Sequence, residues 1–450
     1  MVAHAPEDIS VTRGRVRYLG SMIGRTIRLA ISIALALAAQ DLRSPNPAER
    51  KRAARELTAQ GTAALPHLTQ LLSDPDVEVR VEAVKAIVEI DTQHSLDPLI
   101  QATRDSDPEV QIRATDGLVN FYAPGYVRTG LTASLRRVGG RIKGKFVETN
   151  DQVVDPFVEV RPDVVAALGK LARGGASMEA RANAARAVGI LRGRAAVSDL
   201  LEAIHTKDSQ VIYECLVALQ KIGDPAAAPR VAFLLRDLDE RVQVAAIETM
   251  GLLRHMDALP QLREILYRTG KKSVRRAALR SIAMLPDRAN RELLRKYLND
   301  RDGELREAAA EGLGRIQDPE DLAALEKMFA EERDNSARLS AAFGLVMLGK
   351  ADLSEFGPLR YLINTLNSST RVGEARALLI EAARKSEVRR LLYEPLLGGT
   401  AGERIGLAQV LAQSGDQESL AVLEKVTRDP DPKVAQEALR ALRTLRARLS

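Results

Sequence analysis

The sequence predicts an all-α protein, an α-solenoid of about a dozen stacked helix pairs with one long insertion. Three observations lead to this prediction. Aromatic residues make up only 3% of the 450 residues and tryptophan is absent, so small and medium aliphatic side chains must build the core. One pattern recurs with a period of about 31 residues, the length of two short helices and two turns. No alternating pattern of useful length, as expected for strands, occurs within the recurring units.

Each recurring unit starts with a turn that contains Asp, Pro or Ser. An apolar residue follows, then an arginine, an alanine-rich stretch and a Leu or Ile. When the units are aligned, three of them have Glu214, Ala245 and Glu437 in the arginine column. The column otherwise contains nine arginines: Arg50, Arg80, Arg113, Arg181, Arg275, Arg306, Arg338, Arg376 and Arg404.

The turns carry signals for helix starts and stops. Asp74 precedes Pro75, and Asp107 precedes Pro108. We interpret each pair as a helix N-cap followed by a proline in the first turn, because such an aspartate accepts hydrogen bonds from free amides and proline presets the backbone. A first helix then ends near a glycine, such as Gly223, and a second amphipathic helix follows.

The units over residues 44–449 resemble HEAT repeats, specifically the short HEAT-like repeats of the phycobilin-lyase type. The resemblance implies that the column arginines and the aspartates before them form polar ladders between neighbouring repeats, so we interpret these arginines as structural. Glu214, Ala245 and Glu437 depart from the pattern, which implies an interruption in the middle of the array and at its end. Lyases, hydroxylases, scaffolds and adaptors share this repeat, so the resemblance indicates a fold more than a function.

The longest break in the pattern is an insertion over residues 123–161. It divides one unit, whose first helix runs to about Phe121 and whose second helix starts at Pro162. Residues 155–161 imitate the start of a unit, but the distance from Arg161 to Arg181 is too short for one. Residues 145–148 and 152–160 are compatible with a short hairpin.

Basic residues surround an apolar helical stripe inside the insertion. The candidate binding residues there are Arg128, Arg136, Arg137, Arg141, Lys143 and Lys145. Two interpretations remain open. The insertion is either a docking segment for an anionic partner or surface, or a solvated loop that covers a gap between repeats.

The distribution of charge argues against nucleic-acid binding by the solenoid. The formal net charge is +6, but residues 1–28, 123–155 and 433–450 together carry +10 and the remaining residues carry −4. The repeats themselves therefore offer no basic groove, and aromatic residues that could stack on bases are few.

The N-terminal residues 1–40 have two interpretations. Basic residues precede an apolar run over residues 29–39, and Ala36-Leu37-Ala38 offers a cleavage site for a signal peptide. Met22 would then be a more typical start than Met1. Under this interpretation the repeats over residues 41–450 are periplasmic or secreted, and the mature chain has no transmembrane span. Alternatively, the run is a helix of a capping repeat and the protein is cytoplasmic.

The sequence offers no recognisable catalytic or metal site. HEAT-repeat di-iron hydroxylases hold their metal through His-Glu pairs, whereas none of the five histidines here precedes a Glu or lies at a metal-ligand spacing. A glycine-rich segment ending at Lys145 resembles a phosphate loop, but Phe146 stands where Ser or Thr is required. Cys215 lies in an apolar stretch and is expected in the core. We expect no cofactor.

The sequence therefore predicts a non-catalytic scaffold or adaptor that binds a protein partner, acting in the cell envelope. Two alternatives remain. One is an enzyme or chaperone similar to the phycobilin lyases. The other is an adaptor to a membrane surface or an anionic polymer through the basic insertion.

Overall fold

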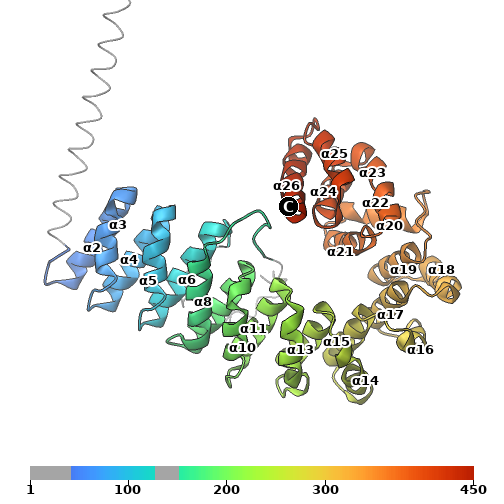
Figure 1. Ribbon diagram of the computed structural model, residues 1–450, viewed down its shortest axis with the longest axis horizontal. Helices are drawn as coiled ribbons and strands as arrows, with labels where there is room; N and C mark the ends of the chain where they lie inside the picture. The colour runs from blue at the N-terminus through green and yellow to red at the C-terminus, as the bar shows by residue number, and fades with distance from the viewer. Residues whose placement is uncertain (1–41, 127–151) are drawn as a thin grey trace, which may run out of the picture. The chain divides into compact units, whose positions relative to one another are not determined.

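The computed structural model describes residues 42–126 and 152–450. Helices dominate both of these ranges, and neither range contains a strand. This confirms the predicted all-α solenoid class. A helices alternate with B helices along the chain, as Figure 1 shows, and the B helices other than α8 are shorter than the A helices. The described residues form two compact units. Unit 1 holds the described residues up to 152 together with residues 161–191, and unit 2 holds residues 153–160 and 192–450.

The A helices are 11 to 18 residues long. They are α2 (Pro47–Thr58), α4 (Val77–Ile90), α6 (Pro108–Tyr122), α9 (Met178–Ile190), α11 (Ser209–Ile222), α13 (Glu240–Leu252), α15 (Lys272–Met284), α17 (Gly303–Ile316), α19 (Asn335–Met347), α21 (Val372–Ala382), α24 (Ala401–Ser414) and α26 (Pro432–Leu449).

The B helices follow the A helices, and short 3-10 turns precede most of them. They are α3 (Leu65–Leu71), α5 (Leu96–Ala102), α8 (Pro162–Gly174), α10 (Val197–Ala203), α12 (Ala228–Val231), α14 (Leu259–Arg268), α16 (Arg291–Tyr297), α18 (Leu322–Glu331), α20 (Pro358–Asn364), the pair α22 (Ser386–Leu391) and α23 (Tyr393–Gly398), and α25 (Gln417–Val426).

Aspartates start most of the A helices, because their side chains accept hydrogen bonds from amides that have no partner within the helix. Asp107 does so for α6, as predicted, with Pro108 as the first helical residue. The prediction was wrong for Asp74. The N-cap of α4 is Asp76, which accepts from the amides of Glu78 and Val79. Asp74-Pro75 precedes the cap, so the same dipeptide occupies two different places in the two turns.

The insertion lies between the two helices of one pair. α6 ends at Tyr122 and α8 begins at Pro162. Residues 152–160 contain no helix or strand, so they do not form the predicted half of a hairpin, while residues 145–148 lie outside the described residues. Residues 1–41, with the signal-peptide segment, also lie outside them. No helix within residues 42–126 and 152–450 is long and apolar enough to cross a membrane.

Neighbouring A helices pack through a repeated contact between small side chains. The twelfth residue of one A helix lies against the tenth residue of the next. Three of these positions are glycines, and a methyl group added to each would meet the neighbouring helix. The added methyl would lie 2.4 Å from Val88 at Gly117, 2.9 Å from the Ser281 backbone at Gly251, and 2.6 Å from the Gly344 backbone at Gly314. The alanine- and glycine-rich composition therefore sets the distance between successive repeats.

Candidate functional site

The most regular polar feature is a ladder of arginines between successive turns. Arg50 donates from Nε and Nη2 to the Asp74 carboxylate, at 2.7 and 2.8 Å, and from Nη1 to the carbonyl of Ser44 at 2.7 Å. Arg80 makes the equivalent bidentate pair with Asp105 and also bonds the carbonyl of Asp74. Each guanidinium thus joins its own turn to the turn of the next repeat.

The same geometry recurs in unit 2. Arg306 donates to the Glu332 carboxylate at 2.7 and 2.9 Å and to the carbonyl of Asp300 at 2.9 Å. These hydrogen bonds hold the pKa of Glu332 below its ordinary value. Arg404 pairs with Asp429 at 2.5 Å. The ladder arginines use their donors on the array itself, which is the geometry of a structural role.

The ladder position is the fourth residue of the A helix, and this corrects the alignment of the sequence in five units. The structure places Gln111, Ile212, Gln243 and Ala435 there, whereas the alignment chose residues two positions later, Arg113, Glu214, Ala245 and Glu437. Arg376 lies one residue after the true position, Ala375. The error arose because the helix N-cap lies at different distances from the Asp-Pro or similar dipeptide that starts each turn.

The corrected residues make other contacts. Arg113 pairs with Glu109 one turn earlier in its own helix, and Arg376 donates to Gln409. Gln111 replaces the ladder arginine and bonds the carbonyl of Asp105 and the amide of Ala176. Neither Ile212 nor Gln243 can form an ion pair, so the ladder is interrupted in the middle of the array.

The remaining column arginines occupy the fourth position without a bidentate acid. Arg181 donates to the carbonyl of Ala172 and Arg275 to the carbonyl of Thr269. The Arg338 guanidinium lies 5.0 Å from the ring centres of both Phe329 and Tyr361, a cation–π arrangement. All three contacts are internal to the repeats.

A second polar cluster joins the A helices α17, α19 and α21. Arg315 forms a bidentate pair with Glu381, at 2.8 Å for both bonds, and also contacts Glu311. Ser340 donates to Glu311. Nearby, burial and the surrounding carboxylates raise the pKa of Glu307 to about 7. The charged groups that act most strongly on Glu307 are all acidic, so the ionised form of Glu307 destabilises the fold.

The six basic residues predicted to bind an anionic partner lie outside the described residues, since they fall between residues 127 and 151. The structure does describe the end of the insertion. There Asp155 accepts hydrogen bonds from Arg440 Nη2 at 2.8 Å and Nε at 3.0 Å, although the two residues are 285 positions apart. Within unit 2, residues 153–160 therefore contact α26.

The contacted face of α26 is the face that other A helices use to pack on their successor. It contains the fifth, eighth, ninth and twelfth residues, Gln436, Leu439, Arg440 and Arg443. The twelfth residue is glycine in α13 and α17 but arginine in α26. The side chain of Arg443 is exposed, and Leu439 is 42% exposed.

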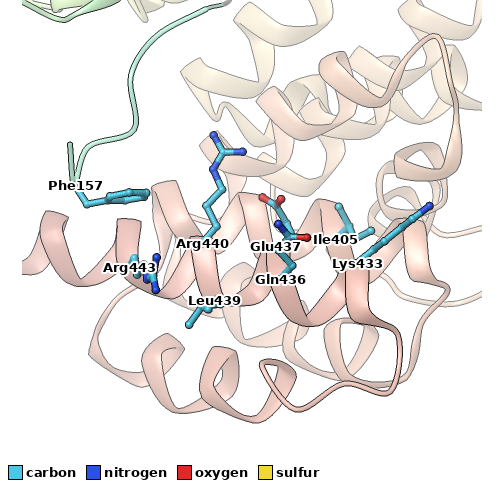
Figure 2. Close-up of a pocket in the computed structure, with 8 residues that line it drawn as sticks. All are labelled: Phe157, Ile405, Lys433, Gln436, Glu437, Leu439, Arg440 and Arg443. Carbon is cyan, nitrogen blue, oxygen red and sulfur yellow. The ribbon is translucent and has the colours of Figure 1, made fainter. Parts of the chain in front are cut away.

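Between this face and residues 153–160 lies a cavity of about 580 Å³, which we name the α26 groove. Its walls include Phe157 from the end of the insertion and Ile405 from α24. From α26 they include Leu439, Gln436, the basic residues Lys433, Arg440 and Arg443, and one acidic residue, Glu437. Figure 2 shows Phe157 and Arg440 on the same side of the helix. The lining combines apolar surface with positive charge, a composition that suits an acidic ligand carrying an apolar group.

No group of three or more His, Cys, Asp or Glu side chains within residues 42–126 and 152–450 is placed to hold a metal ion. Cys215 is buried, as predicted. His205 stacks on Phe233 with ring centres 5.5 Å apart. The sequence did not predict the α26 groove. The excess of basic residues over residues 433–450 was visible in the sequence, and these residues form one wall of the groove.

A family model described as HEAT repeats matches residues 35–119, 165–250, 228–289 and 260–346, which together make up more than half of the chain. Among curated proteins, phycocyanobilin lyase subunit alpha of Picosynechococcus sp. is 31% identical over 179 residues. The similarity covers 37% of this chain, and the chain spans 65% of the length of that relative.

Two solved structures also match the chain, each with a TM-score below 0.5. The complex of CpcE and CpcF of phycocyanin lyase from Nostoc sp. matches with a TM-score of 0.37 and 24% identity, covering 59% of this chain and 92% of the other. Importin beta matches with a TM-score of 0.40 and 14% identity, covering 98% of this chain and 66% of the other.

Proposed function

Because the chain belongs to the HEAT-repeat family, we propose that it is a non-catalytic scaffold or adaptor that binds a protein partner. The observation that carries the proposal is the contrast between paired and unpaired charge. The ladder arginines bond to acids and carbonyls of the array. Lys433 and Arg443, beside the exposed Leu439, have no ion-pair partner among the described residues. Exposed apolar surface with unpaired charge is typical of a protein-binding surface.

The test is affinity capture from an extract of the native organism, quantified by mass spectrometry. We compare the wild-type chain with a Lys433→Glu/Arg443→Glu variant, whose substitutions are on the surface and should leave the helical circular-dichroism spectrum unchanged. The proposal expects proteins that the wild type enriches and the variant loses. If the wild type enriches no protein above the bare matrix, the scaffold function is wrong.

A second candidate is a role similar to that of the lyases, and the 31% identity to phycocyanobilin lyase subunit alpha supports it. The test is to incubate the chain with phycocyanobilin and apo-phycocyanin and to measure covalent attachment by the fluorescence of the denatured product. The scaffold proposal expects no attachment above the reaction without the chain. Attachment that depends on the chain would favour the lyase-like role.

The basic insertion supports a third candidate, an adaptor to an anionic membrane surface or polymer. Binding to vesicles of anionic lipid should weaken as salt rises, because ions screen the attraction to Arg136, Arg137 and Arg141. Reversal of these three residues to Glu should abolish binding while the helical spectrum is preserved. Equal binding by both proteins would contradict this role.

We also propose that the protein acts in the cell envelope, on the basis of the signal-peptide pattern in residues 1–40. Expressed from Met22 in a Gram-negative host, the chain should appear in the periplasm with Ala39 or Gln40 as its first residue. An unprocessed cytoplasmic product would contradict the export proposal and favour the capping helix.

A further inference from the structure

The end of the insertion already holds a short turn against the α26 groove. The amide of Val158 donates to the carbonyl of Asp155 at 2.9 Å, which closes a turn over residues 155–158. Asp-Pro sequences favour such turns, because proline presets its own backbone angle and the aspartate accepts local hydrogen bonds. The turn presents the Asp155 carboxylate to Arg440 and places Phe157 in the wall of the groove.

This contact identifies the chemistry that fits the groove. A carboxylate forms a bidentate pair with Arg440, and an aromatic ring two residues later reaches the cavity. The pairing joins residues 285 positions apart, so local chain geometry does not enforce it. Complementary charge and an apolar side chain beside Leu439 explain it instead.

The contact is also exposed enough to be exchanged. The side chains of Arg440 and Asp155 retain 55% and 28% of their accessible surface. Ion pairs with this degree of exposure contribute little to stability. Residues 152–160 have no helix or strand hydrogen bonds that would have to break, so their displacement by a competing ligand costs mainly the burial of Val154.

Residues 153–160 fill only part of the α26 groove and pair with only one of its basic side chains. About 580 Å³ remains open beside Phe157, within the range of cavities that bind ligands. Lys433 and Arg443 have no ion-pair partner in the part of the chain that the structure describes. A ligand with additional acidic residues would therefore gain contacts that the internal turn lacks.

We propose that the α26 groove is a docking site for an acidic turn-forming peptide segment of a partner protein, which gives a carboxylate to Arg440 and an aromatic ring to the cavity. Residues 153–160 occupy the groove as an internal competitor, and the partner displaces them. The inference rests on the proposed scaffold function and names the chemical class of its partner.

The test measures binding of a fluorescein-labelled peptide with the sequence of residues 152–160 to the full chain by fluorescence anisotropy. Three proteins are compared: the wild type, an Asp155→Asn/Phe157→Ala variant with a weakened internal competitor, and the same variant with Arg440→Glu. We expect the weakened-competitor variant to bind the peptide at least about tenfold more tightly than the wild type, which corresponds to about 1.4 kcal/mol. Addition of Arg440→Glu should abolish binding, and a peptide with Ala in place of its Phe should bind much more weakly.

Circular dichroism and thermal melting establish that each variant is folded, and Arg443→Glu replaces Arg440→Glu if the latter unfolds. Equal peptide affinity of the wild type and the weakened-competitor variant would overturn the proposal. Binding of anionic vesicles but not the peptide would also overturn it, as would a concentration-dependent doubling of mass through exchange of residues 153–160 between copies. If the wild type still captures partners from extract in any of these cases, the scaffold function stands and only the docking site fails.

Discussion

At the scale of single residues, the stability of the array depends on a few paired charges with little exposure. The Arg306–Glu332 pair is bidentate, and its side chains are 18% and 9% exposed. We expect Arg306→Ala to cost about 3 kcal/mol, because it leaves a largely buried carboxylate without its partner. Arg390→Ala is the matched control, since Arg390 and Glu418 form an exposed pair on the same unit and its loss should change stability little. Urea unfolding of both variants measures the difference.

The same pair has a defined pH dependence. The pKa of Glu332 is depressed in the folded state, so its contribution is full above the ordinary glutamate pKa and is lost as pH falls through the folded value. The difference in unfolding free energy between wild type and Arg306→Ala should therefore shrink on acidification. An equal difference at neutral and acidic pH would contradict the ion pair as its cause.

Glu307 behaves in the opposite sense. Its pKa is raised to about 7 in the folded state. Between the ordinary pKa of glutamate and this value, the folded protein therefore binds a proton that the unfolded chain does not bind. This difference stabilises the fold at the acidic end of the range. Stability is lost as pH rises toward 7. Glu307→Gln should raise the melting temperature by roughly 2 °C or more at pH 8 and by less at pH 5.5. A gain that is equal at both pH values would show that charge repulsion is not the cause.

At the scale of helices, the spacing of the repeats depends on residues without side chains. A methyl group at Gly314 would lie 2.6 Å from the Gly344 backbone on the next A helix. Gly314→Ala should therefore cost about 1–3 kcal/mol through overpacking. Gly373→Ala is the control, because nothing lies within 4 Å of its added methyl group and helix propensity then favours alanine. Thermal unfolding that ranks the two variants in the reverse order would contradict the packing rule.

At the same scale, the sequence predicted where the A helices lie but not the register of the ladder. The alanine-rich stretches identified the A helices, and Pro162 located the resumption of the divided pair at α8. The ladder register could not be read from Asp-Pro alone. Asp107 is an N-cap, whereas Asp74 is a ladder acid two residues before the cap. Ile212, at the fourth position of α11, gave no polar signal at all, so alignment on the nearest charged residue chose Glu214.

At the scale of the whole chain, a contact between residues far apart in sequence decided the candidate site. The excess of basic residues in α26 was visible in the sequence, but its relation to Asp155 was not, because 285 positions separate the two residues. The prediction placed binding on the basic residues 128–145 of the insertion, whereas the described geometry directs attention to its end, at Asp155 and Phe157. A repeat period predicts contacts between neighbours and is silent about contacts across the array.

We propose that this chain binds a partner protein through the α26 groove and not through the ladder arginines. Hydrogen–deuterium exchange of the wild-type chain, with and without a partner captured from the native extract, distinguishes the two surfaces. On binding we expect slower exchange in residues 432–449, faster exchange in residues 152–160 as the internal turn is displaced, and no change around Arg50, Arg80 and Arg306. Slower exchange confined to the ladder turns, with α26 unchanged, would rule out binding through the groove.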